Sequence, residues 1–155
     1  MLYDLEERTE DAFVALLRAG LPGEMRVYPA WTDEAIQYPC AVVHAGTSDA
    51  VSEQAEWHSS RQIAVEISVM TEAVAVKNGA GSVMITSRER NAEARSAVLT
   101  VLSTASLLTD AIAAAGPGVA FSMAQLGGPV VRSVNDRIFV TIIPVDVIAN
   151  PVEVA

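Results

Sequence analysis

The sequence of 155 residues holds one cysteine and two histidines. A lone thiol, Cys40, excludes a disulfide framework within the chain. His44 and His58 are the only imidazoles, and they give no spacing suited to zinc. We therefore expect no disulfide, metal or other cofactor, and a reducing, cytoplasmic site of synthesis is compatible with this composition.

Basic residues are also scarce. The 10 lysines and arginines face 19 aspartates and glutamates, which leaves a formal net charge of -9. This charge opposes the counterion release that holds most proteins to a nucleic-acid backbone, so a specific DNA-binding module is disfavoured. An acidic wall past which DNA slides without sticking is compatible with the same charge.

Long apolar runs are missing as well. No stretch of about 18 consecutive apolar residues occurs, so a membrane span is not predicted. A signal peptide would begin with basic residues and continue with an apolar run. The first eleven residues instead carry acids, and we expect no secretion by that route; the acids are Asp4, Glu6, Glu7, Glu10 and Asp11.

The clearest pattern that is present lies between Gln62 and Met70. Apolar residues alternate there with polar or small ones, which is the period of a half-buried strand; the apolar set is Ile63, Val65, Ile67 and Val69. A strand of this kind belongs to an antiparallel sheet with one face on a core and one face left open. The candidates for that open face, or for the wall of a lumen, are Gln62, Glu66 and Ser68.

The order of elements predicts an α+β fold of two layers, a mostly antiparallel sheet with helices packed on one face, in a single domain over residues 1–155. The last strand is the most apolar and is expected to be central, with Pro144 marking a bulge or an edge. Ser87 is the predicted N-cap of the second helix. The expected helices are 4–19, 87–103 and 107–115, and the expected strands are 25–28, 40–45, 61–71, 119–126, 130–134 and 137–149.

The stretch 74–86 has two short apolar runs around Asn78-Gly79, which is typical of a hairpin, and a mobile loop is the alternative. Its apolar residues have no clear place in a two-layer core, so we expect it to be an arm at a subunit interface. The candidate interface residues are Val76, Lys77, Val83 and Met84, joined by Arg88 and Trp57.

Arg88 belongs to a basic group with Arg90 and Arg95 at the start of the second helix. The group is interpreted either as a solvated face or as a surface that meets the carboxylates of a partner. Trp57 and Trp31 lie in polar loops, where they either fold back on the core or anchor a protein interface.

The search for catalytic chemistry finds no complete set. The segment 46–50, Gly-Thr-Ser-Asp-Ala, comes within one residue of a nucleophile elbow, but no suitable later acid and histidine follow it. Cys40 and His44 are four residues apart on one predicted strand, about 13 Å at the usual rise, too far for a thiolate pair. The glycines of 79–81 lack the frame of a phosphate loop. We expect a protein that is not an enzyme.

One family resemblance spans most of the chain. The segment Arg26-Val27-Tyr28-Pro29, the segment Pro39-Cys40-Ala41-Val42-Val43, the alternating strand and the alanine-rich helix follow in an order that resembles the tail-terminator and tail-completion proteins of long-tailed, siphovirus-like bacteriophages. The resemblance implies a small α+β subunit without an active site. It also implies assembly into a ring, commonly a hexamer, that caps the tail tube where the head-side connector joins.

The same resemblance implies a virion protein of the tail or neck, made in the cytoplasm of the host bacterium. Its expected partners are other copies of the chain, the tail tube protein and the head-tail connector or stopper, with DNA passing through the channel without specific binding and with no membrane. Two alternatives remain open. One is another neck protein, for head completion or as a stopper, and the other is a small enzyme or binding module with a cryptic site near Ser48, Glu56 and His58.

Overall fold

The computed structural model describes residues 5–50, 61–78, 81–103, 119–127, 130–133 and 137–151. The expectations for 107–115, Glu56, Trp57 and His58 lie outside these residues. The helices are α1 (Leu5–Gly20) and α2 (Ser87–Leu102). The strands are β1 (Arg26–Pro29), β2 (Cys40–Ala50), β3 (Arg61–Glu72), β4 (Val74–Asn78), β5 (Gly81–Ile85), β6 (Val119–Leu126), β7 (Val130–Ser133) and β8 (Ile138–Pro151).

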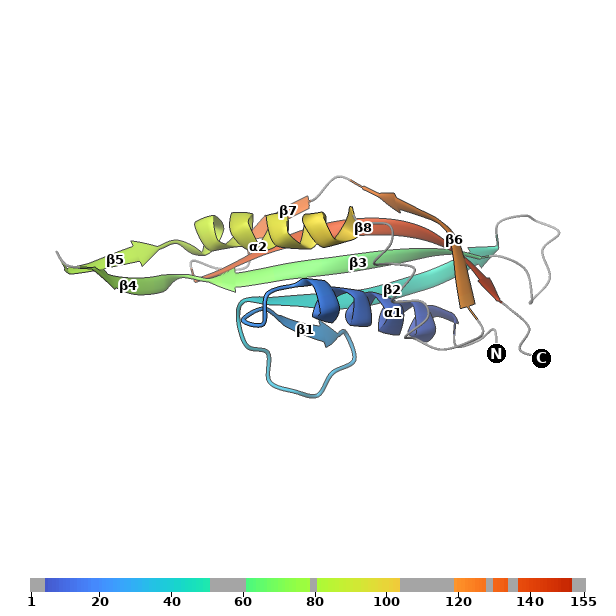
Figure 1. The fold of residues 1–155 in the computed structure, drawn as a ribbon, viewed down its shortest axis with the longest axis horizontal. Helices are drawn as coiled ribbons and strands as arrows, with labels where there is room; N and C mark the ends of the chain where they lie inside the picture. The colour runs from blue at the N-terminus through green and yellow to red at the C-terminus, as the bar shows by residue number, and fades with distance from the viewer. Residues whose placement is uncertain are drawn as a thin grey trace.

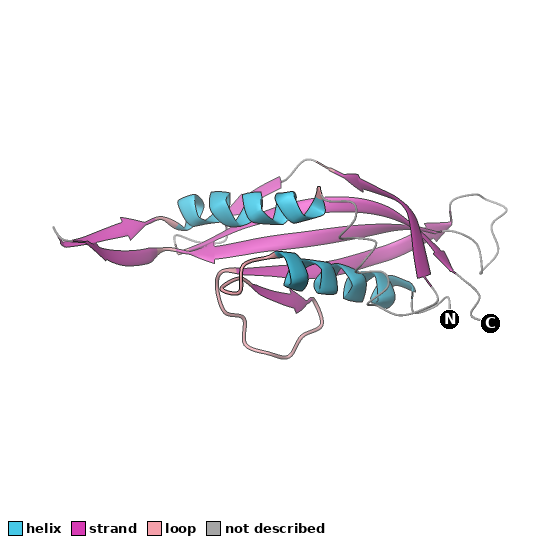
Figure 2. Ribbon diagram, in the orientation of Figure 1, coloured by secondary structure: helices cyan, strands magenta, loops and turns pink. Residues whose placement is uncertain are grey.

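Six strands form one sheet in the order β1-β2-β3-β8-β6, with β7 also paired to β8. All neighbours are antiparallel except β1 and β2, which run parallel. Both helices lie against the same face, as Figures 1 and 2 show. The α+β prediction is confirmed, and so is the central position of the last strand, because β8 pairs with β3 on one side and with β6 and β7 on the other.

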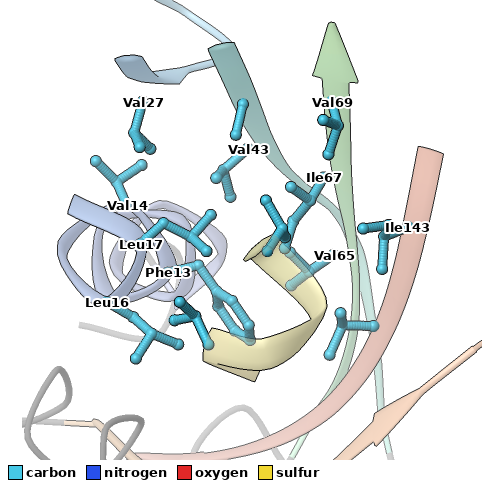
Figure 3. Packing of buried hydrophobic residues seen from close by; sticks show 14 of the residues in the cluster. Phe13, Val14, Leu16, Leu17, Val27, Val43, Val65, Ile67, Val69 and Ile143 are labelled. Atoms are coloured by element: carbon cyan, nitrogen blue, oxygen red, sulfur yellow. The ribbon is translucent and has the colours of Figure 1, made fainter. Parts of the chain in front are cut away.

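The core lies between the helices and the sheet (Figure 3). The alternation of β3 is confirmed, since its four apolar residues are buried under the helices. Helix α1 meets them with Phe13, Leu16 and Leu17, all at most 2% exposed. Each such side chain contributes about 1.5–3 kcal/mol when it is removed from water, so this seam is the main source of stability.

Gly20 at the end of α1 touches α2. A Cβ atom there would lie 2.8 Å from Val101 Cγ2 and 2.9 Å from Val101 Cγ1. Val101 is buried and β-branched, so it has little freedom to move away. We expect Gly20→Ala to lower the free energy of unfolding by about 1–2 kcal/mol, despite the better helix propensity of alanine. Urea unfolding measures this change in free energy, and Ala19→Gly at the exposed neighbouring position is the control. A Gly20→Ala variant that is more stable than the parent would contradict the close contact.

Strand β2 is longer than expected. The sequence predicted that it ends at Ala45 before a polar turn, but the strand continues to Ala50 because Ser48, Asp49 and Ala50 pair with β3. The register shifts between Ala45 and Ser48, where a bulge takes up the polar Gly-Thr residues. Pairing with a neighbouring strand has thus overridden the local turn preference.

The predicted N-cap of α2 is wrong by one residue. Thr86 has the extended backbone of a cap, and its Oγ1 accepts the backbone N–H of Glu89 at 3.2 Å. Ser87 is instead the first helical residue and is buried. Its carbonyl accepts the hydroxyl of Thr71 at 2.6 Å, which attaches the start of α2 to β3.

Pro144 lies inside β8 and opposite Glu66 of β3. Its carbonyl oxygen accepts the N–H of Gly127 at 2.9 Å, on the side where β6 ends and β7 has not yet begun. A residue in a strand points its N–H and C=O to the same side, so the N–H that proline lacks would face this gap. Pro144 therefore marks the break between two strands that share one neighbour.

A polar group is buried between α2 and the two central strands. Asn91, which is fully buried, donates from Nδ2 to the carbonyl oxygens of Val69 at 2.9 Å and Phe139 at 3.1 Å. Its Oδ1 accepts the hydroxyl of Thr141 at 2.5 Å. One carboxamide thus joins α2 to β3 and β8 with all its partners in place, which fixes the position of the helix along the sheet.

Candidate functional site

The outer edge of the sheet at β1 is closed by α1. The backbone N–H of Arg26 donates to Pro39 O, and that of Ala30 donates to Val43 O. The backbone groups of the alternate residues Val27 and Pro29 therefore point away from β2. The guanidinium of Arg18 donates to the carbonyl of Val27 from Nη2 at 2.9 Å and from Nε at 3.3 Å. Pro29 has no N–H to offer. This short strand therefore presents little to which another strand can add.

Beyond the end of β1, the carboxylate of Glu10 lies against the edge of β2 in the place of a strand. Ala45 is the next residue of β2 that faces this edge after Val43, and its N–H is accepted by Glu10 Oε2 at 3.1 Å. His44 Nδ1 lies 4.0 Å from the same oxygen. Glu10 is 6% exposed, and its second oxygen is buried without a hydrogen-bond partner in the described part of the chain. Glu10 thus caps the edge of β2 beyond the end of β1.

We expect Glu10→Ala to lower the free energy of unfolding by about 1–3 kcal/mol, because the N–H of Ala45 loses its acceptor in a buried position. Glu10→Gln keeps an oxygen at the same distance along the side chain and should cost less than the alanine variant. Urea unfolding of both variants measures the difference. If the two variants lose equal stability, the hydrogen bond to Ala45 is not what Glu10 contributes.

The hairpin β4–β5 stands apart from this closed edge. Among the described strands, β4 and β5 pair only with each other, and Figure 1 shows the hairpin extending beyond the end of the main sheet. The glycine-containing segment 74–86 thus forms the hairpin rather than a loop. A two-stranded hairpin on its own is marginally stable in water.

The register of the hairpin sorts its residues into two faces. Val74 lies opposite Ile85, and Val76 opposite Val83, so these four positions share one face of the ribbon. Every residue of that face is β-branched and apolar. The other face holds the pairs Ala75–Met84 and Lys77–Ser82. Of the predicted interface residues, Val76 and Val83 are therefore brought together, while Lys77 and Met84 share the opposite face.

Arg88 follows the hairpin directly, in the first turn of α2, and is exposed. Arg90 is not a freely solvated group, since its Nη1 donates to the carbonyl of Glu72 at 3.0 Å and so joins α2 to the end of β3. The basic group expected at the helix start is thus divided: one member is exposed at the base of the hairpin, and another fastens the helix to the sheet.

An open hollow of about 260 Å³ lies between α2 and the turn that follows α1. Its walls are mainly apolar, with charged groups at the rim. The lining residues are Pro22, Glu24, Met25, Pro39, Arg90, Glu93, Ala94 and Ala97, and together they define what we call the α2 groove. Sequence reasoning missed this groove because its residues come from three separate segments.

The face of the sheet away from the helices carries the predicted open-face residues. Gln62 and Glu66 are exposed there, and Ser68 is half-buried. The register sets Ser68 between Val42 and Ile142, both of which are half-buried and apolar. The face away from the helices is therefore partly apolar at this end. The alternation of one strand does not show the apolar neighbours that the adjoining strands supply.

Trp31 and Ile36 belong to the connection between β1 and β2 and are 68% and 41% exposed. Trp31 therefore does not fold back on the core. The same connection turns towards the sheet at Gln37, whose N–H is accepted by the hydroxyl of buried Tyr28 at 3.3 Å. Large exposed side chains of this kind are common anchors in protein interfaces.

Ser48 lies in strand β2 opposite Ile63. A nucleophile elbow requires a sharp turn from a strand into a helix, so the local geometry at 46–50 is not that of an elbow. Within the described ranges, no group of three or more His, Cys, Asp or Glu side chains is arranged to hold a metal ion. No helix among the described residues is long and apolar enough to cross a membrane.

Cys40 is fully buried, and burial raises the pKa of its thiol from 9.0 to about 12. Below pH 9 the thiol is neutral in both the folded and the unfolded chain. Between pH 9 and 12 only the unfolded chain ionises, so this group lowers the stability as the pH rises through that range.

We expect the native protein to react with iodoacetamide at pH 8 at least about a hundredfold more slowly than the unfolded chain, because both the thiolate and the access are missing. Mass spectrometry of samples alkylated with and without denaturant measures the ratio. Rapid modification of the native protein contradicts the burial of Cys40.

The fold and its surfaces define a small α+β protein with one sheet edge closed by its first helix and a free hairpin at one end. No protein-family model matches the chain, and no curated protein matches it.

Proposed function

We propose that the chain is a structural protein of a bacteriophage virion, a ring-forming tail terminator that caps the tail tube at the head-tail junction. The observation that carries this proposal is the β4–β5 hairpin, which pairs only with itself among the described strands and whose register sets four apolar residues on one face of the ribbon. A segment of this kind is suited to a neighbouring subunit. The order of elements that resembles tail terminators supplies the identity of the assembly.

The closed β1–β2 edge supports the same proposal. Arg18 and Glu10 satisfy main-chain groups that a neighbouring strand would otherwise reach. Self-association by adding strands at this edge is therefore disfavoured. The net charge of -9 is suited to a conduit through which DNA passes without being held.

Tail tubes assembled from the tube protein of the same phage provide the test. We expect the purified protein to bind one end of these tubes in negative-stain electron micrographs and to form a ring-sized particle there. Light scattering without tubes measures whether the ring forms on its own. A protein that leaves tubes uncapped contradicts the proposal.

A matched pull-down against portal subunits separates the tail terminator from the other neck proteins. Capture by the portal and not by the tube would identify a head-completion or stopper protein, which would share the acidic conduit. Capture by neither would count against both. In each experiment, a variant that lacks hairpin residues 75–84 is compared with the parent protein.

A further inference from the structure

Among the described residues, two large apolar side chains are exposed, and both belong to the connection between β1 and β2. Trp31 is 68% exposed and Ile36 is 41% exposed. We call this connection, residues 30–39, the Trp31 loop, and Figure 2 shows it extending outward beside β1. Tryptophan brings a large area to a contact and is enriched at the positions that dominate binding between proteins. The loop therefore presents an anchor that a partner protein can bury.

Hydrogen bonds hold the Trp31 loop in place. The N–H of Thr32 donates to the carbonyl of Pro29 at 3.1 Å, which closes a four-residue turn with Trp31 at its third position. The N–H of Glu34 then donates to Thr32 Oγ1 at 3.2 Å. The hydroxyl of buried Tyr28 holds the far end of the loop by accepting a backbone N–H at 3.3 Å. Order that exists before binding reduces the entropy lost on association, so this loop is prepared for a contact.

The charge of the loop is wholly negative. Asp33 and Glu34 lie between Trp31 and Ile36 in the chain and are both exposed, and residues 30–39 include no basic residue. Acids beside an apolar anchor attract a partner of positive charge and repel phosphate groups. Nucleic acid, anionic lipid and a second copy of the chain, with its net charge of -9, are therefore disfavoured at this loop.

We propose that the Trp31 loop docks on a basic surface of another protein, with Trp31 in an apolar pocket and with Asp33 and Glu34 beside the lysine or arginine side chains that border it. The partner is a protein other than a copy of this chain. The contact is additional to the proposed function and relies on that function only for the choice of tail tube protein and portal protein as probes.

Hydroxyl-radical footprinting measures whether the indole is covered. Tandem mass spectrometry follows the oxidation of Trp31 and separates it from Trp57, which lies on the same tryptic peptide. We expect tail tubes to slow the oxidation of Trp31 about fivefold relative to the free protein, because the anchor of a contact is excluded from water. Slowing by the portal protein would support the same docking on the other probe. Oxidation that neither probe slows would overturn the docking.

Three further conditions test the disfavoured occupants. Duplex DNA, vesicles of phosphatidylglycerol and a higher concentration of the protein alone should each leave the oxidation rate of Trp31 unchanged. Slowing by DNA or by vesicles would overturn the basic chemistry of the partner. Slowing at higher protein concentration would mean that copies bind one another through this loop, and it would overturn the proposal as well.

Trp31→Ala should weaken binding to the probe that covers the indole at least about tenfold, because it removes the anchor of the contact. The side chain is exposed, so urea unfolding of the variant should match that of the parent. Gln37→Ala, at an exposed position of the same loop, is the matched control and should weaken binding less than about twofold. Equal effects of the two variants would overturn the role of Trp31 as the anchor.

The double variant Asp33→Asn and Glu34→Gln tests the charge of the contact. It should weaken binding about fivefold at low salt and less at high salt, because salt already screens the attraction that the variant removes. Glu93→Gln, at an exposed acid of α2, is the control and should leave binding unchanged. Binding that the double variant strengthens or leaves unchanged would overturn the basic character of the partner surface.

The failure of the docking and the failure of the proposed function give different results. If tubes are capped and neither probe slows the oxidation of Trp31, the docking is wrong and the tail terminator stands. If tubes stay uncapped and the portal protein slows the oxidation, the docking stands and the tail terminator is wrong. Uncapped tubes together with oxidation that neither probe slows would overturn both.

Discussion

Asn91→Asp is expected to lower the free energy of unfolding at pH 7 by about 3–5 kcal/mol, the range seen when a buried charge loses its compensation. The Nδ2 group of Asn91 donates to two carbonyl oxygens, and an aspartate would set a negative oxygen against them. The side chain is fully buried, so water does not offset this repulsion. The two residues have the same shape, which leaves charge and hydrogen bonding as the difference.

The loss should depend on pH in a known direction. The folded state favours the neutral acid, so the pKa of the introduced carboxyl is raised above its usual value of about 3.9. The neutral form can donate its proton to one of the two carbonyls. The deficit in stability relative to the parent is therefore small near pH 4 and grows as the pH rises through the neutral range. Urea unfolding of parent and variant across pH 4–8 measures the difference.

Thr141→Val is the matched variant in the same group. It removes the hydroxyl that donates to Asn91 Oδ1 and leaves no new charge, so its effect should be near 1 kcal/mol and independent of pH. A deficit for Asn91→Asp that does not change with pH would mean that the carboxyl is solvated, and that α2 does not hold this side chain between β3 and β8.

Removal of the hairpin is expected to abolish assembly and leave the folded subunit. Val74 and Ile85 are register partners, so a two-residue Asn-Gly turn can join them directly after residues 75–84 are deleted. Among the described strands, β4 and β5 pair only with each other, so the unfolding transition should shift by no more than about 1 kcal/mol in free energy. The capping of tail tubes should fall below detection.

Circular dichroism and urea unfolding report the fold of the shortened chain, and electron microscopy of tubes reports its assembly. Replacement of the exposed Gln37 by alanine, in the connection between β1 and β2, is the control, and it should leave the capping of tubes unchanged. A shortened chain that no longer folds would show that the hairpin belongs to the core. A shortened chain that still caps tubes would show that the arm is not the contact between subunits.

The elements with strong periodicity were predicted closely. The apolar stripe of α1 and the alternation of β3 are local patterns, because each follows from which face of one element is buried. The limits of β2 were not predicted, since Ser48 to Ala50 are held in the strand by partners on β3 and their own composition favours a turn. Pairing across the sheet is a property of two segments, and a single segment does not contain it.

The buried polar residues left a weak signal in the sequence. Asn91 falls on the stripe formed by Ser87, Ala94, Val98 and Val101, at spacings of three and four residues, and a polar residue on such a stripe must find partners. Its partners on β3 and β8 could not be named without the topology. Glu10 likewise lies on the buried side of α1, but its acceptor role depends on where β1 stops.

The position of α1 in the chain has a consequence for how the protein is made. A ribosome completes residues 5–20 before β1 and β2 exist, so the side chains of Arg18 and Glu10 have already been made when the strands they cap emerge. The β1–β2 edge can thus be covered as soon as it forms. The floor of the α2 groove, by contrast, is completed by residues that are synthesised after the hairpin. The central strand β8 is made last of all, so the sheet and the groove are both completed only after the hairpin has been synthesised.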